Sequence, residues 1–166
     1  MEFLNFLTHI PKIVKVFFVS MLPIVELRGA IPYGAMVGEK LDIFSCYFAC
    51  VLGNLLPIPF ILLFIKKILE YMSKSKVKFF NTLSNKLIDK ANKRSKKMNE
   101  GTFWALFLFV AIPLPGTGAW TGALIASLMG IRFKKSMLAI ALGVLVAGLI
   151  MSLGSYGIVG AFEIFA

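Results

Sequence analysis

Long apolar runs without charge dominate the chain. Two of them, residues 43–65 and 136–162, contain 23 and 27 residues with no charged side chain. An α-helix rises about 1.5 Å per residue, so each run is long enough to cross a hydrocarbon layer about 30 Å thick. The pattern therefore predicts two membrane-spanning helices.

Two further apolar runs are interrupted near their centres by Pro and Gly. Residues 16–38 also contain two charged side chains, and residues 101–131 would form a straight helix about 46 Å long. Proline removes a backbone donor and glycine weakens a helix, while unpaired backbone groups cannot face lipid. We expect two re-entrant helical hairpins, with a kinked full crossing as the alternative for each. The residues expected to shape the turns are Pro23, Gly29, Pro32, Pro113, Pro115, Gly116 and Gly118.

Composition supports a membrane protein. Hydrophobic residues make up 58% of the 166 positions and charged residues only 16%, whereas soluble domains have about 45–50% and about 25%. A soluble chain this small could not bury so much apolar surface. Sixteen phenylalanines also exclude a disordered chain.

The basic residues predict the topology. Eleven of the 18 Lys and Arg lie within 66–97, and three more lie within 132–135. Both segments are expected in the cytoplasm because cytoplasmic loops are rich in Lys and Arg. The hairpin 101–131 must then return to the side it left, which gives two inverted repeats with both chain ends outside. Lys12 and Lys15 argue against this orientation at the N-terminus.

The predicted architecture is all-α and integral to the membrane, as a single domain over 1–166. The first repeat covers 12–65 and the second covers 101–162, each with a re-entrant hairpin and one transmembrane helix. A basic connector, 66–100, joins them. Apolar residues at helical spacing make 76–97 a basic amphipathic helix that would bind anionic lipid headgroups, with a specific protein partner as the alternative. No recognition module accompanies the charge, so nucleic-acid binding is not expected.

The first hairpin contains the ionisable pair Glu26 and Arg28. Charged groups at membrane depth are costly and indicate function. Glu26 is the candidate for proton coupling, and Arg28 could hold an anionic group or tune Glu26. The alternative is a clamp, in which Glu26 binds Arg28 or the backbone and keeps the turn closed.

Uncharged polar residues could complete the site. Thr117, Trp120 and Thr121 in the second hairpin are candidates to line a cavity, where a half-helix would point its N-terminal amides at an anion. Tight helix packing is the alternative use of the small residues there. Asn54 in the first span either lines the path or bonds to a neighbouring helix.

Other chemistry is not indicated. Cys46 and Cys50 share a helix face, where we expect them to pack as small hydrophobic residues. Two cysteines and one histidine support neither a disulfide framework nor a zinc site, so no metal or cofactor is expected. No nucleophile elbow or zinc-binding histidine pair is present, so the chain is not expected to be an enzyme.

The motifs Glu-Leu-Arg-Gly-Ala-Ile-Pro at 26–32 and Pro-Leu-Pro-Gly-Thr-Gly-Ala-Trp-Thr-Gly at 113–122 resemble those of the small multidrug export family of prokaryotic membrane proteins. That family looks like a distant branch of the DedA/VTT superfamily, which has two inverted repeats of hairpin plus helix. The resemblance matches Glu26 to the intramembrane acid of the first hairpin. The second half departs from the pattern, because 113–122 contains no arginine and Arg132 lies beyond it.

The resemblance implies a proton-coupled transporter, or a lipid carrier or scramblase. We therefore expect a secondary transporter in the prokaryotic cell membrane, with its site between the two hairpin tips and a lipid phosphate or lipophilic small molecule as substrate. The alternatives are an uncoupled scramblase and a membrane scaffold. Four short hydrophobic units shield two buried turns poorly, so a homodimer is expected.

Overall fold

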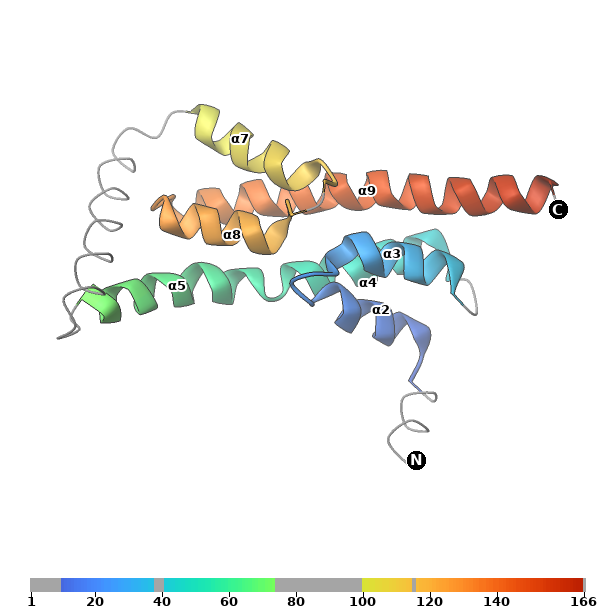
Figure 1. Cartoon of the computed structure of the whole chain (residues 1–166), viewed down its shortest axis with the longest axis horizontal. Coiled ribbons are helices and arrows are strands. Elements are labelled where there is room, and N and C mark those ends of the chain that lie inside the picture. The colour runs from blue at the N-terminus through green and yellow to red at the C-terminus, as the bar shows by residue number, and fades with distance from the viewer. Residues whose placement is uncertain (1–9, 38–40, 74–99, 115, 166) are drawn as a thin grey trace. The chain divides into compact units, whose positions relative to one another are not determined.

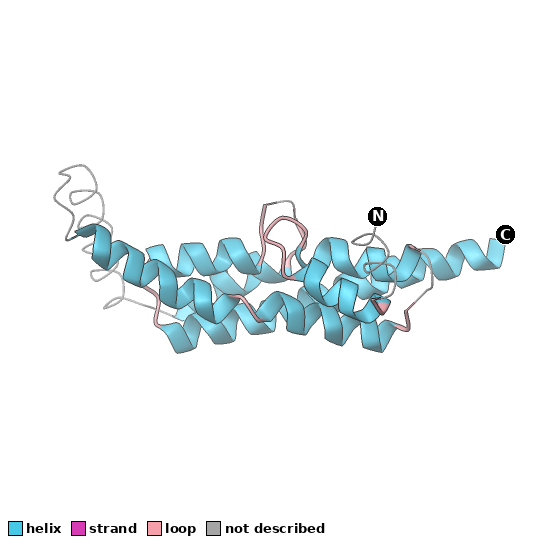
Figure 2. Cartoon of the chain, turned by 90° about the horizontal axis from the view of Figure 1, so that it is seen from below, coloured by secondary structure: helices cyan, strands magenta, loops and turns pink. Residues whose placement is uncertain are grey.

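The computed structural model describes residues 10–37, 41–73, 100–114 and 116–165. All regular secondary structure in these residues is helical, which confirms the predicted all-α class for this part of the chain (Figure 2). The helices are α2 (Lys12–Ser20), α3 (Glu26–Met36), α4 (Ile43–Leu55), α5 (Ile58–Ser73), α7 (Glu100–Ala111), α8 (Ala119–Leu128) and α9 (Phe133–Phe165).

Two helical segments are long and apolar enough to cross a membrane. They are Ile43–Ile65, with 23 residues, and Phe133–Ala161, with 29 residues. The first segment is interrupted at Leu56 and Pro57, between α4 and α5, because proline cannot donate within the helical ladder. Large apolar side chains cover the outside of these helices; Phe44, for example, is 73% exposed. Such surfaces would be unfavourable in water and suit lipid.

The chain forms two compact units. The first unit comprises Met1–Leu56 and Leu145–Ala166, and the second unit comprises Pro57–Val144. Each unit therefore contains one pair of short helices and part of each long helical segment.

In the first unit, α2 and α3 form an antiparallel helical hairpin packed on α4 (Figure 1). Lys12 at the start of α2 donates to the carbonyl oxygen of Gly34, near the end of α3. Gly34 lies against Cys46 of α4, and Gly53 lies against the carbonyl of Phe17 in α2. Thus α3 runs antiparallel to α4, while α2 runs parallel to it.

The C-terminal part of α9 completes the first unit. Gly148 packs against the ring of Tyr47, whose hydroxyl donates to the carbonyl of Leu145 at 3.1 Å. The Tyr156 hydroxyl donates to the carbonyl of Leu41 at 2.7 Å, just before α4 begins. These two bonds hold α9 along the N-terminal half of the first span.

In the second unit, α7 and α8 form another short-helix pair, and α8 also packs on α5. Gly122 of α8 is close to Val110 of α7, and Gly143 of α9 contacts the same valine. The helices are interrupted over 112–118, as the Pro/Gly cluster predicts. Gly116 has a φ of 79°, a left-handed value that glycine adopts without a Cβ penalty.

The first turn is shorter than predicted. It covers residues 21–25 and includes Pro23, whereas Gly29 and Pro32 lie inside α3. An interior proline costs a helix one hydrogen bond. Here α3 is stabilised by a buried face at helical spacing that includes Ala30 and Ile31, both fully buried.

The middle of the chain is described only in part. Helix α5 continues through Lys66 and Lys67 to Ser73, so the predicted connector 66–100 begins inside a helix. The predicted amphipathic helix 76–97 lies outside the described residues. The re-entrant orientation of the hairpins and their inverted repeat remain predictions.

Candidate functional site

Glu26 lies where the first hairpin turns. It is the first residue of α3, its side chain is only 5% exposed, and its amide donates to the carbonyl of Leu22 at 2.9 Å. Its φ is +50°, the only positive φ of a non-glycine residue in the described part of the chain. A non-glycine residue in this region is strained by about 1–3 kcal/mol. A buried carboxyl group and local backbone strain therefore coincide at this residue.

Arg28 is two residues further along α3 and half-buried. It interacts electrostatically with Glu26. A nearby guanidinium favours the ionised form of a carboxyl group and presents a planar fork of donors to any anion. The pair therefore combines a proton-titratable group with a permanent positive charge.

Asn54 is almost fully buried near the end of α4, and its Oδ1 atom has no hydrogen-bond partner in the described structure. Glu26 precedes Gly34 by eight residues, and Asn54 follows Cys46 by eight residues. Helices α3 and α4 run antiparallel, with Gly34 beside Cys46. Eight residues advance by the same length along each helix, so Glu26 and Asn54 lie at the same height along the helix pair.

Ser20 belongs to this level as well. It is fully buried at the end of α2 and lies beside Gly53, the neighbour of Asn54. Its hydroxyl donates to the carbonyl of Phe17 at 2.8 Å. We name Ser20, Glu26 and Asn54 the polar layer of the first unit. The polar layer lies at the turn end of the first hairpin.

The second hairpin holds its turn with a hydroxyl group. The Thr117 hydroxyl donates to the carbonyl oxygens of Ile112 and Leu114, at 3.0 and 2.9 Å. Trp120 and Thr121 are half-buried in the first turn of α8. The structure thus gives Thr117 a role in shaping the turn, which the sequence attributed to the prolines and glycines alone.

The candidate residues belong to different units. Glu26, Arg28 and Asn54 are in the first unit, and the second unit contains the three candidates of the other hairpin, Thr117, Trp120 and Thr121. Pro115 lies outside the described residues. The shared site between the hairpin tips remains a prediction.

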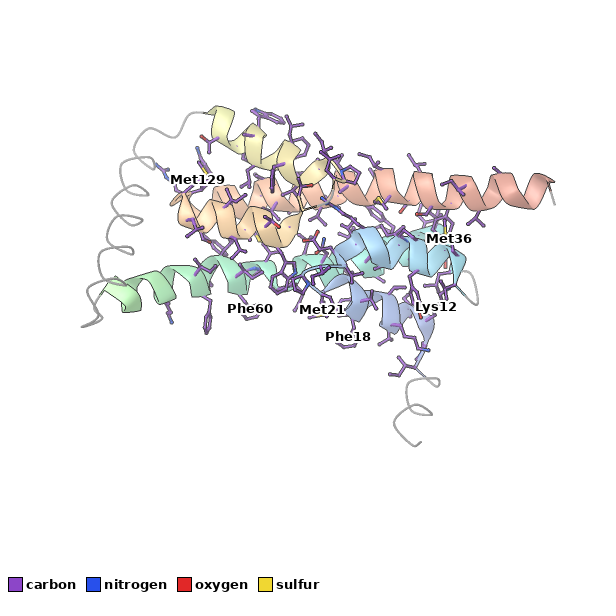
Figure 3. The ribbon with its side chains drawn as sticks, in the orientation of Figure 1. Lys12, Phe18, Met21, Met36, Phe60 and Met129 are labelled. Atoms are coloured by element: carbon purple, nitrogen blue, oxygen red, sulfur yellow. The ribbon has the colours of Figure 1, made fainter. Side chains whose placement is uncertain are left out.

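Sequence reasoning missed the part played by Lys12. Its ammonium group donates to the carbonyl of Gly34 at 3.0 Å and to that of Val37, and it lies 5.7 Å from the centre of the Tyr33 ring. Figure 3 shows Lys12 at the open end of the hairpin, near the labelled Met36. A cation there satisfies the last carbonyls of α3 and complements the negative end of its dipole. A lysine placed 24 residues before the end of α3 gives no local sequence signal.

Comparison with known proteins gives one match. The family model described as "Putative small multi-drug export protein" matches residues 26–150, from Glu26 into α9. No curated protein and no solved structure matches. The two long apolar helices and the export family agree on a membrane location. Because the match covers well over half of the chain, the protein belongs to the small multidrug export protein family.

Proposed function

We propose that the protein is a proton-coupled secondary exporter of the prokaryotic cell membrane, with Glu26 as the coupling group. The observation that carries the proposal is the burial of the Glu26 carboxyl group on a strained backbone, within the polar layer. Ionisable residues buried in a membrane protein are rare and costly, and they commonly mark transport pathways and proton relays. Membership of an export family supports assigning Glu26 such a role.

The lengths of the short helices support re-entrant hairpins. Helices α2 and α3 have 9 and 11 residues, and α7 and α8 have 12 and 10. Each arm is therefore about 13–18 Å long, close to half of a hydrocarbon layer. Arms of this length would bring the turn of the first hairpin, and with it Glu26, to mid-membrane depth.

The composition of the two units supports repeated halves. The first unit combines its hairpin with α4 and the C-terminal part of α9, and the second combines its hairpin with α5 and the N-terminal part of α9. Each hairpin is thus grouped with the beginning of the long helical segment that follows it in the chain and with the end of the other long helical segment. Two inverted repeats like those of the DedA/VTT superfamily would produce this exchange. The positive-inside rule then places 66–97 and 132–135 in the cytoplasm.

Asn54 of the polar layer and the nearby Arg28 offer a partner for each protonation state of Glu26. The Asn54 Oδ1 acceptor has no donor in the described structure, and a protonated carboxyl group has an O–H to donate. The charge of Arg28 stabilises the ionised form instead. Proton uptake would shift the preference of Glu26 from Arg28 to Asn54, which couples the proton to a change in the hairpin turn.

The charge of Arg28 also constrains the substrate. A lipid phosphate would bind its guanidinium, whereas a lipophilic cation would be repelled by it. We propose that the substrate is one of these lipophilic classes, that the protein acts as a homodimer, and that anionic lipids bind 76–97. No cofactor or enzymatic step is part of the proposal.

The test uses purified protein in liposomes with an internal pH dye. A proton gradient is imposed and lipophilic cations or lipid phosphates are added, for wild type, Glu26→Gln and Arg28→Ala. We expect one substrate class to change the internal pH and Glu26→Gln to abolish the change. The added compound that elicits the pH change identifies the substrate class. If that compound is a lipid phosphate, Arg28→Ala should also weaken its binding, whereas transport of a cation should not require the guanidinium.

Two other outcomes would contradict coupling. Flipping of fluorescent lipids that needs no gradient and persists in Glu26→Gln would show a scramblase. If neither the pH assay nor the lipid-flipping assay gives a signal, and circular dichroism shows that all variants are folded, a scaffold is favoured. Asn54→Leu serves as a further check, because it should weaken coupling while leaving both charges in place.

A further inference from the structure

The first unit contains a second group of reactive side chains, away from the polar layer. Cys46 and Cys50 are the only cysteines of the chain, and both are free and fully buried. They are four residues apart within α4, so their side chains share one face of the helix. The transport proposal makes no use of them.

Polar groups lie close to the Cys46 thiol. The Cys46 thiol donates to the carbonyl of Ile31 at 3.9 Å, and it also interacts with Cys50 and with the hydroxyl of Tyr156. Gly34 leaves the space that Cys46 occupies, because a Cβ at position 34 would lie 2.3 Å from the sulfur atom. Three elements, α3, α4 and α9, therefore meet at one sulfur-rich position.

The spacing on the helix favours a bridging ion over a disulfide. The Cβ atoms of residues four apart on a helix are about 5–6 Å apart. A disulfide requires about 3.5–4.5 Å, so it would distort α4. Two thiolates bound to one metal ion at about 2.3 Å each hold their sulfur atoms up to roughly 4.6 Å apart, which this spacing accommodates.

We propose that Cys46 and Cys50 bind one soft monovalent metal ion, Cu⁺ or Ag⁺. Soft thiolate ligands select such ions. Each thiol loses its proton as a sulfur–metal bond forms, so two protons are released and the site gains a net charge of −1. In the described residues no three His, Cys, Asp or Glu side chains gather to hold a metal ion, but a two-coordinate ion needs only the two thiolates.

Lys12 supplies the balancing charge. Its ammonium group binds the carbonyl of Gly34, the residue that abuts the Cys46 sulfur. In a low-dielectric interior, a nearby cation reduces the cost of a bis-thiolate metal centre. The same lysine that closes the hairpin thus lies beside the proposed site. This inference does not rest on the proposed transport function.

The test is a competition for Cu⁺ between the full-length protein in detergent micelles and the chromophoric chelator bicinchoninate, without oxygen. Wild type is expected to remove one Cu⁺ per chain from the chelator. Cys46→Ser and Cys50→Ser should each weaken the affinity by at least about tenfold, and the double variant should not compete. Phe48→Leu is the matched control, because it alters an exposed side chain of the same helix without removing a thiol.

The chain's eight methionines are present in every variant, so thioether binding appears as a constant background. Circular dichroism of each variant verifies that the fold is retained. Protection of both thiols from alkylation by bound Ag⁺, read by mass after unfolding, gives a second measure. Equal affinity of wild type and the double variant, or Cu⁺ uptake only by the unfolded chain, would overturn the proposal.

Discussion

Gly53 determines how closely the first hairpin packs on the first span. A Cβ at this position would lie 2.2 Å from the carbonyl oxygen of Phe17 and 2.2 Å from the hydroxyl oxygen of Ser20. The first of these is backbone and cannot rotate away, so α2 must move by about 1 Å to restore ordinary contact. Overpacking of this kind costs about 1–3 kcal/mol. We therefore predict that Gly53→Ala is destabilising.

The control is Gly154→Ala, since a Cβ at Gly154 meets nothing within 4 Å. Alanine raises helix propensity by up to about 1 kcal/mol at both positions, so this gain cancels in the comparison. Gly53→Ala should be about 1–3 kcal/mol less stable than Gly154→Ala in SDS titrations followed by circular dichroism. It should also reduce the proton-coupled signal, because Ser20 and Asn54 of the polar layer flank the position.

A second substitution sharpens the comparison. Ser20→Ala removes the hydroxyl oxygen but leaves the Phe17 carbonyl, so it should not rescue Gly53→Ala. Equal stability of Gly53→Ala and Gly154→Ala, or full rescue by Ser20→Ala, would refute the close backbone packing of α2 on α4.

Three further predictions concern the same unit. Gly34→Ala should lower the free energy of unfolding by about 1–3 kcal/mol, and adding Cys46→Ala should restore much of that loss. If the two effects simply add in a double-mutant cycle, the contact between Gly34 and Cys46 is contradicted. Lys12→Met should destabilise the hairpin by about 0.5–2 kcal/mol, and Lys15→Met by less than about 0.5 kcal/mol. Equal losses of stability in SDS titrations would refute the role of Lys12 in binding the last carbonyls of α3. Hydrogen bonds at the start of α4 hold the pKa of the exposed Asp42 carboxyl below its usual value of about 3.9, so its contribution to stability is present above that pH and is lost as the pH falls through the lowered pKa. When the pH is lowered from 7 to 3, the melting temperature of Asp42→Asn should therefore fall less than that of wild type. An equal fall in the two proteins would contradict this prediction.

The helical class and the two long apolar segments could be predicted because their signal is local. Twenty-three consecutive uncharged residues at 43–65 can satisfy their backbone in lipid only as a helix, whatever the rest of the chain does. The second interruption was equally clear, since 113–118 contains two prolines and two glycines in six positions. Local composition alone is enough for such features.

The first turn and the polar layer depend on packing. Gly29 and Pro32 suggest an unwound segment, yet the buried face of α3 against α4 keeps both inside a helix. The shared level of Glu26 and Asn54 follows from the close approach of Gly34 to Cys46, which no sequence pattern encodes. Sequence could identify the candidate residues but not which of them share a level.

The two turns solve the same backbone problem with different residues, and the difference bears on function. In the second hairpin the left-handed position at φ 79° is Gly116, which adopts this region without strain. In the first hairpin it is Glu26, at φ 50°, where glycine would relieve about 1–3 kcal/mol of strain. The same residue also buries a carboxyl group, which interacts electrostatically with Arg28. A purely structural turn has no need of either feature, so their coincidence at one residue is the reason that our proposed function assigns the coupling group to the first hairpin and not to the second.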